Sequence, residues 1–211
     1  SYNRAMKLIA LLGILVCSVV CAQSPRVSTQ LLADHSSVSA GEEFHVGVLF
    51  EIEPDWHIYW KYPGDAGMAT MIKWSVPEGF TVSDIIWPTP TRFTQEGDID
   101  GYGYEGSVML LAKVLPPKDY SGPATIKAQV RWLACKTICV IGRSSLETTV
   151  NVGANSSPSN SETFAQWLKR VPMDLGESPL EVDVRRSGLV YELTVRGVPQ
   201  TAELDVYVAP P

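Results

Sequence analysis

Residues 124–132 alternate strictly between apolar and polar side chains, and this alternation constrains the fold more than any other feature of the chain. A period of two is typical of a β-strand that buries one face and exposes the other. The segment therefore predicts a half-buried strand whose even positions face a core. The even positions are Ala124, Ile126, Ala128, Val130 and Trp132, and the odd positions are Thr125, Lys127, Gln129 and Arg131.

Other short segments show the same period, and turn residues separate them. The chain has 15 prolines and 16 glycines, which favours many turns and short strands over long helices. About eight such strands in succession predict an all-β, immunoglobulin-like antiparallel β-sandwich over residues 23–153. We expect strands at 27–33, 44–52, 56–60, 72–76, 80–87, 108–114, 124–132 and 146–152, and exposed loops at 62–67 and 92–103.

The N-terminal segment has the pattern of a secretion signal. Met6-Lys7 begins a short basic region, and residues 8–20 are apolar, so residues 1–22 are interpreted as a signal peptide with a few upstream residues. A lipoprotein signal acylated at Cys21 is the alternative. In either case the exported chain keeps Cys135 and Cys139 in an oxidising compartment. The net charge of −6 argues against a nucleic-acid partner, which requires a basic surface.

The residues after 153 predict a linker and the start of a second β unit. Residues 154–179 begin with Ser, Asn and Pro, which is typical of a linker. Within them, residues 162–170 predict a short helix with Ser161 as its N-cap. Strands are expected at 180–184, 189–195 and 204–208. Because so few strands cannot close a core, we interpret residues 180–211 as the truncated start of a second β domain.

Cys135 and Cys139 are the candidate functional residues. Four residues of extended strand span roughly 13 Å, whereas bridged cysteines have Cα atoms about 4.4–6.8 Å apart. The two can therefore form a disulfide only if residues 136–138 make a tight turn. A bridge across so small a loop stabilises a fold less than a long-range bridge. The alternation also predicts that Cys135 lies on the outer face, where Lys136 and Arg131 would favour the thiolate.

Two other interpretations of the pair remain open at this stage. One is a secreted immunoglobulin-like binding module in which a structural disulfide holds a hairpin. The other is a Cu(I) site of two thiolates, to which Met68 and Met71 could add soft ligands. His35, His45 and His57 lack a metal-ligand spacing. No phosphate-binding glycine loop is present, and we expect neither a bound metal nor a cofactor.

Four segments, taken in order, resemble the periplasmic N-terminal domain of the DsbD/ScsB disulfide reductases. The resemblance covers roughly residues 27–152, and its most specific part is the cysteine segment with the Trp-Leu that precedes it. The Cys-x3-Cys spacing is tighter than that of DsbD and closer to the ScsB type. The segments are Trp56–Gly67, Trp74–Phe80, Tyr102–Gly106 and Trp132–Cys139.

The resemblance implies a redox function for the pair. It implies that Cys139 forms the mixed disulfide with a partner and that Cys135 resolves it. It places Phe93 on a cap loop over the site, and His57 and Tyr59 on a flanking strand. A membrane reductase domain, of the same or another chain, would reduce the pair. The reduced pair would then reduce oxidised periplasmic dithiol proteins of thioredoxin-like or isomerase-like type, some of them linked to copper tolerance.

Overall fold

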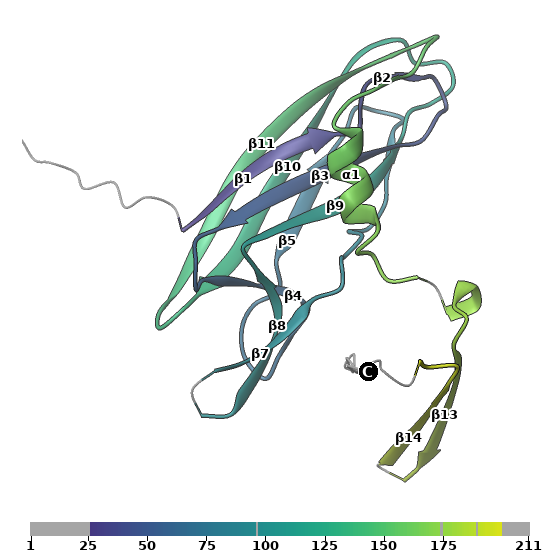
Figure 1. Ribbon diagram of the computed structural model, residues 1–211. Coiled ribbons are helices and arrows are strands. Elements are labelled where there is room, and N and C mark those ends of the chain that lie inside the picture. Colours follow the sequence, from purple (N-terminus) through teal and green to yellow (C-terminus); the bar gives the residue numbers. More distant parts are fainter. Residues whose placement is uncertain (1–25, 96, 174, 189, 200–211) are drawn as a thin grey trace, which may run out of the picture.

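Two sheets pack face to face and form the body of the protein (Figure 1). A computed structural model describes residues 26–95, 97–173, 175–188 and 190–199. The first sheet has four strands in the order β1-β3-β9-β6. Their bounds are β1 (Val27–Ala33), β3 (Phe44–Ile52), β6 (Thr81–Val82) and β9 (Ser107–Leu115).

The second sheet has eight strands and contains the longest hairpin of the described chain. Its order is β12-β2-β11-β10-β4-β8-β7, and β5 pairs with β10 beside β4. All its pairings are antiparallel except that of β11 with β2, which is parallel. Its bounds are β2 (His35–Ser39), β4 (His57–Gly64), β5 (Met71–Ser75), β7 (Thr91–Gln95), β8 (Ile99–Glu105), β10 (Gly122–Cys135), β11 (Cys139–Gly153) and β12 (Ser157–Pro158).

The core lies between the inner faces of the two sheets, as the alternation predicts. Every even residue of β10 from Ala124 to Ala134 is buried, whereas the odd residues from Pro123 to Arg131 are exposed. The aromatic rings of Phe50 and Trp132 meet edge to face across the two sheets, with centroids 5.7 Å apart. The prediction of an all-β, immunoglobulin-like sandwich is therefore confirmed.

The prediction of an exposed loop at 92–103 is wrong. Strands β7 and β8 form a hairpin here, and β8 pairs with β4. The glycines that suggested a loop instead permit close packing: a Cβ at Gly103 would lie 2.0 Å from the carbonyl oxygen of Ile58. Glycine in a strand often marks such a close backbone approach. The expected loop at 62–67 is partly strand as well, because β4 continues to Gly64.

The expected strand at 80–87 is mostly absent. Only Thr81 and Val82 pair with β9, and a single isolated bridge follows between Ile86 and Leu111. The polar strands β2 and β12 were not predicted, because Ser-rich sequences carry little strand signal. The two strands pair with each other at the edge of the second sheet.

The segment expected to be a linker contributes to the sandwich. Helix α1 spans Ser161–Leu168, and its Phe164 and Trp167 are buried within the hydrophobic core cluster. The N-cap is Asn160 rather than Ser161. Asn160 has a left-handed backbone with φ 51°, and its side-chain amide donates to the carbonyl of Ala33, at 2.9 Å. That hydrogen bond fixes the helix to the end of β1.

The remaining described residues form a short helix and a hairpin. A 3-10 helix covers Leu175–Glu177, and β13 (Glu181–Ser187) pairs with β14 (Val190–Arg196). Both strands agree with the sequence prediction to within a few residues. The interpreted signal peptide and the strand expected at 204–208 lie outside the described residues. No helix within the described ranges is long and apolar enough to cross a membrane.

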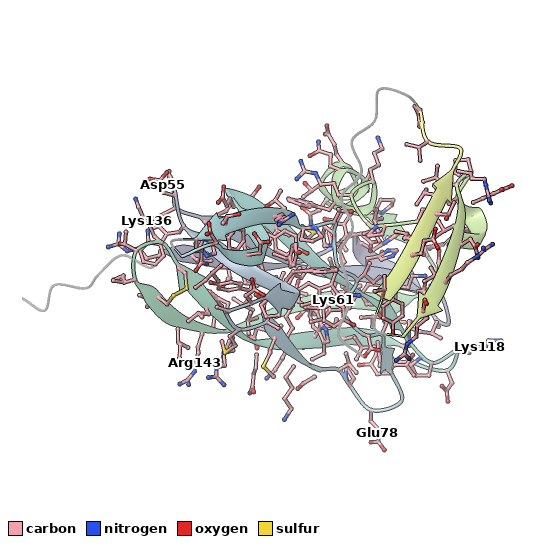
Figure 2. The ribbon with its side chains drawn as sticks, turned by 90° about the horizontal axis from the view of Figure 1, so that it is seen from below. Asp55, Lys61, Glu78, Lys118, Lys136 and Arg143 are labelled. Carbon is pink, nitrogen blue, oxygen red and sulfur yellow. A yellow bond between two sulfur atoms is a disulfide. The ribbon has the colours of Figure 1, made fainter. Side chains whose placement is uncertain are left out.

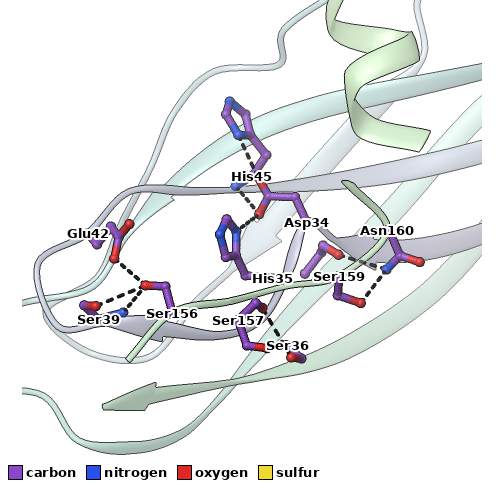
Figure 3. A network of polar contacts seen from close by, with 11 residues as sticks. Asp34, His35, Ser36, Ser39, Glu42, His45, Ser156, Ser157, Ser159 and Asn160 are labelled. Atoms are coloured by element: carbon purple, nitrogen blue, oxygen red, sulfur yellow. Dashed lines mark hydrogen bonds and ion pairs between the residues drawn. The ribbon is translucent and has the colours of Figure 1, made fainter. Parts of the chain in front are cut away.

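A polar network ties the strands together at the end of the sandwich near β2 (Figure 3). Asp34 accepts from the backbone N–H of His45 at 3.0 Å. Its carboxylate also lies 2.8 Å from Nδ1 of His35 and 3.0 Å from Nδ1 of His45. Partial burial opposes ionisation of Asp34, but the hydrogen bonds from His45 and His35 outweigh it, so the pKa of Asp34 lies below its ordinary value.

Replacing Asp34 should destabilise the fold in a pH-dependent way. We expect Asp34→Ala to lower the free energy of unfolding by about 1–3 kcal/mol at pH 7, because the charged acceptor of a part-buried network is lost. The lowered pKa stabilises the fold above about pH 4 and ceases to do so as pH falls through the folded-state pKa. Urea unfolding at pH 7 and pH 3 measures both effects. The exposed Asp119→Ala is the control; an equal effect from both variants would contradict this role.

Candidate functional site

The two cysteines lie at the tip of the β10–β11 hairpin. Cys135 ends β10, Cys139 begins β11, and the register places them directly opposite each other. The backbone N–H of Lys136 donates to the carbonyl of Ile138 at 3.0 Å, which closes the turn that the spacing required. The cysteines form a disulfide with a Cα–Cα distance of 4.1 Å. The bridge therefore joins neighbouring strands of one sheet and does not connect the two sheets.

The two sulfur-bearing residues differ in exposure. Cys139 is exposed, whereas Cys135 is only 1% exposed. The expectation that Cys135 lies open on the outer face is therefore wrong. Cys135 has a strand on both sides, because it pairs with His57 of β4 as well as with Cys139 of β11. The alternation of side chains along one strand does not show which residues of adjacent strands lie beside it.

A group of aromatic and polar side chains lies beside Cys135. The ring of Phe93, on β7, lies 4.1 Å from that of His57, centroid to centroid. Tyr59 contacts both rings, at 5.2 Å from His57 and 5.9 Å from Phe93. His57 and Tyr59 are buried, and Phe93 is half-buried. The structure thus brings together the three flanking residues that the resemblance singled out, with Phe93 on a hairpin rather than a loop.

Gln95 connects the β7–β8 hairpin to this group, and no sequence signal pointed to it. Its side-chain amide donates to the Tyr59 hydroxyl at 2.9 Å and lies 3.1 Å from Nε2 of His57. Burial lowers the pKa of His57 below its ordinary value, so the imidazole is neutral at neutral pH. A neutral ring with its proton on Nδ1 can accept the Gln95 hydrogen bond at Nε2, and a protonated ring cannot.

The charges around the pair differ from the expectation that Lys136 favours a thiolate. Lys136 forms an ion pair of 2.9 Å with Asp55, and Figure 2 shows these two side chains side by side at the end of the hairpin. The carboxylate offsets the lysine charge. Arg131 lies on the outer face four residues before Cys135, which is roughly 13 Å along the strand. Lys136 thus follows Cys135 directly in the chain but is paired with Asp55, whereas Arg131 is distant along the strand.

A cleft opens where the cysteine turn meets the β7–β8 hairpin. Its volume is about 470 Å³, and its walls come from β4, β7, β8 and the turn itself. Sequence reasoning missed most of its lining, because these residues come from segments far apart in the chain. The lining residues are Asp55, His57, Phe93, Thr94, Gln95, Glu105, Lys136 and Thr137.

The copper interpretation requires soft ligands beside the two cysteines. Within the described part of the chain, no group of three or more His, Cys, Asp or Glu side chains could hold a metal ion. Met71 pairs with Arg131 in the sheet, so it lies about four residues away from Cys135 along β10. His35 and His45 belong to the Asp34 network.

Comparison with known proteins identifies the family. The family model for the N-terminal region of the thiol:disulfide interchange protein DsbD matches residues 28–151, including both cysteines. The chain belongs to this DsbD N-terminal family. Membership makes it a thiol–disulfide interchange domain, and the Cys135–Cys139 disulfide is the bond in the chain that fits this chemistry.

Similar solved structures include two N-terminal domains, one of ScsB and one of DsbD. The N-terminal periplasmic domain of ScsB from Proteus mirabilis is 26% identical, with a TM-score of 0.62 over 89% of this chain and 71% of that one. The reduced N-terminal domain of DsbD from Neisseria meningitidis is 12% identical, with a TM-score of 0.35 over 62% of this chain and 88% of that one. No curated protein sequence matches the chain.

The unequal burial predicts unequal reactivity of the two thiols after reduction. Iodoacetamide should alkylate Cys139 about tenfold faster than Cys135, because the reagent reaches an exposed thiolate more readily than a buried thiol. Peptide mass spectrometry after timed quenching gives both rates. Phe93→Ala should reduce the ratio of the two alkylation rates, because it removes the ring that packs against His57 beside Cys135. Phe93→Leu is the control, because it keeps an apolar side chain at that position. Equal rates in the unsubstituted protein would contradict the assignment.

Proposed function

We propose that the chain is a periplasmic electron relay that reduces the disulfides of other proteins through Cys135 and Cys139. One observation carries the proposal: the bridge pairs a buried cysteine with an exposed one inside a three-residue turn. An exchange pair needs one sulfur that a partner can reach and a second that is protected until it resolves the intermediate. Family membership supports the same chemistry.

The structural-staple alternative is disfavoured by where the bridge lies. A loop as short as residues 135–139 gains no more than about 2 kcal/mol from loop closure. The two strands that it joins are already paired through the whole length of β10. The two sheets are held by the packed core, in which Phe50 meets Trp132. The disulfide is thus not needed to close the sandwich.

The proposed reaction transfers two electrons to the partner. The Cys139 thiolate attacks one sulfur of the partner's disulfide, and that disulfide breaks as a Cys139–partner bond forms. The partner's second sulfur leaves as a thiolate and takes up a proton. Cys135 then loses its proton and attacks the Cys139 sulfur. The Cys135–Cys139 disulfide forms, and the partner's remaining thiolate leaves and is protonated, so the partner becomes a dithiol.

His57 is the residue best placed to take the proton from Cys135. The two are register partners on adjacent strands, and the side chains of such partners lie on the same face of a sheet with Cβ atoms about 4.5–5.5 Å apart. Because burial lowers the pKa of His57, its ring is neutral at neutral pH, and Nε2 would take the proton in exchange for the hydrogen bond that it accepts from Gln95. The cleft beside the turn offers the partner's cysteine segment a place to bind.

The partners follow from the family and from the compartment. The similar ScsB domain is described as periplasmic, so we place this chain in the periplasm. A membrane reductase domain, of the same or another chain, would return electrons to the pair. Oxidised periplasmic dithiol proteins of thioredoxin-like or isomerase-like type would receive them. The closer likeness to ScsB leads us to include proteins linked to copper tolerance among these acceptors.

The reduction potential and the stability of the reduced protein test the redox function. Equilibration in defined thiol buffers should give a potential well above about −300 mV, the level below which structural disulfides typically lie. Reduction should lower the free energy of unfolding by no more than about 2 kcal/mol. A very low potential, with unfolding on reduction, would make the bridge a structural staple.

Single cysteine variants test the roles of the two sulfurs. Incubated with glutathione disulfide, Cys135→Ser should accumulate a stable Cys139–glutathione adduct, because no second thiol can resolve it. Cys139→Ser should form at least about tenfold less adduct in the same time, because its remaining thiol is buried. The unsubstituted reduced protein should release glutathione and form its own disulfide. Intact-mass spectrometry measures adduct formation by all three proteins. Equal adduct formation by the two variants would contradict the roles assigned to Cys135 and Cys139.

A further inference from the structure

The outer face of β5, β10 and β11 carries cross-strand pairs that can be compared directly. Thr125 and Thr149 are partners whose hydroxyls lie 3.2 Å apart. Lys127 and Glu147 are the next partners, and they form an ion pair of 3.7 Å. Both kinds of pair stabilise a sheet. This end of the face therefore follows the ordinary rules of strand pairing.

The pair nearer the disulfide breaks those rules. Arg131 lies directly opposite Arg143, and like charges in that position destabilise a sheet. The register adds a third cation, since Lys73 on β5 is the partner of Gln129. Within the described residues, none of these three side chains forms an ion pair or a side-chain hydrogen bond. A chain that breaks a local rule without compensation usually does so at a functional surface.

The arginine pair lies on the same face as the cysteines. Alternate residues of β10 and β11 give the pairs Arg131–Arg143, Leu133–Ile141 and Cys135–Cys139, in that order toward the tip. The arginines are thus roughly 13 Å from the disulfide. Figure 2 shows the Arg143 side chain pointing away from the hairpin, with the yellow disulfide bond nearer the tip. A partner that reaches Cys139 along this face also reaches the arginines.

Exposed apolar side chains lie beside the cations and between them and the disulfide. Ile141 is 51% exposed, and Met71, the β5 partner of Arg131, is 56% exposed. A groove of about 500 Å³ runs between β5 and β11, and its lining includes Met71, Lys73, Arg131 and Arg143. Arginine and methionine are enriched at protein interfaces. Arg131 lies between Met71 on β5 and Arg143 on β11, and Ile141 lies between this row and the disulfide.

We propose that this face, defined by Lys73, Met71, Arg131, Ile141 and Arg143, is the docking surface for the redox partner. The partner is an oxidised dithiol protein with Asp or Glu side chains roughly 13 Å from its disulfide, beyond an apolar patch. Charge complementarity is the argument: three unpaired cations lie together on a chain whose formal net charge is −6. Such a local field steers an acidic partner toward the site and repels basic ones. The inference rests on the proposed exchange function.

The test compares disulfide-cyclised Cys-x-x-Cys peptides that carry an acidic Asp tail, a neutral Ser tail or a basic Lys tail. The reduced protein should reduce the acidic peptide about tenfold faster than the basic one at low ionic strength. The difference should shrink in high salt. Chromatography of quenched samples measures the rates. Reduction of the neutral peptide tests the exchange function alone. Equal rates for all three peptides would contradict the docking surface, whereas no reduction of any peptide would contradict the exchange function.

A charge-reversed variant isolates the surface. Arg131→Glu with Arg143→Glu keeps two like charges opposite each other but inverts their sign. The free energy of unfolding of this variant should therefore be close to that of the unsubstituted protein. Its rate preference should invert from the acidic peptide to the basic peptide. Lys118→Glu with Lys169→Glu changes two exposed lysines away from this face, makes the same change in net charge and should retain the acidic preference. Equal loss of preference in both double variants would overturn the proposal in favour of overall charge.

Two other occupants of the face give distinct results. Concentration-dependent sedimentation that Arg131→Glu with Arg143→Glu abolishes, without any peptide preference, would assign the face to a second copy of this chain. Binding to vesicles of anionic lipid, with equal rates for all three peptides, would assign it to a membrane surface. Either result would overturn the proposal of an acidic protein partner.

Discussion

The pairing of β10 with β11 is the contact on which the rest of the structure depends. Its register runs without interruption from Gly122–Val152 to Cys135–Cys139. The even positions of β10 supply the inner layer of the core, and the tip of the hairpin carries the disulfide that closes the turn. Because side chains alternate on a strand, a slip of one residue would exchange the buried and exposed faces and separate the cysteines. Core packing and redox chemistry are thus fixed by the same register.

The site owes its asymmetry to what lies beside the hairpin rather than to the cysteines themselves. Strand β4 covers one sulfur-bearing residue through His57, while Cys139 begins an edge that stays open. The β7–β8 hairpin adds Phe93 and Gln95 against the same histidine. Two chemically identical side chains thereby acquire different surroundings. A thiol pair needs such a difference if one sulfur is to meet a partner and the other is to release it.

Sequence reasoning works where the signal is local and weakens where it depends on neighbours. Strands β1 and β3 match their predicted bounds, because alternation along one strand reports one buried face. The sequence of the β7–β8 hairpin predicts a loop instead, because the packing role of Gly103 depends on Ile58, which lies against it only in the folded chain. The burial of Cys135 and the contacts of Gln95 also depend on strands distant in sequence. The family resemblance supplied Phe93, His57 and Tyr59, which composition and spacing alone would not have selected.

Helix α1 bears on where one folding unit ends and the next begins. The family match stops at residue 151, yet Phe164 and Trp167 belong to the same core as the strands before them. The backbone N–H of Thr89 also donates to the carbonyl of Arg170. The part of the chain shared with the family is therefore shorter than the part that packs as one body. A redox domain excised at the end of the shared part would leave an apolar gap where the two aromatic rings now lie.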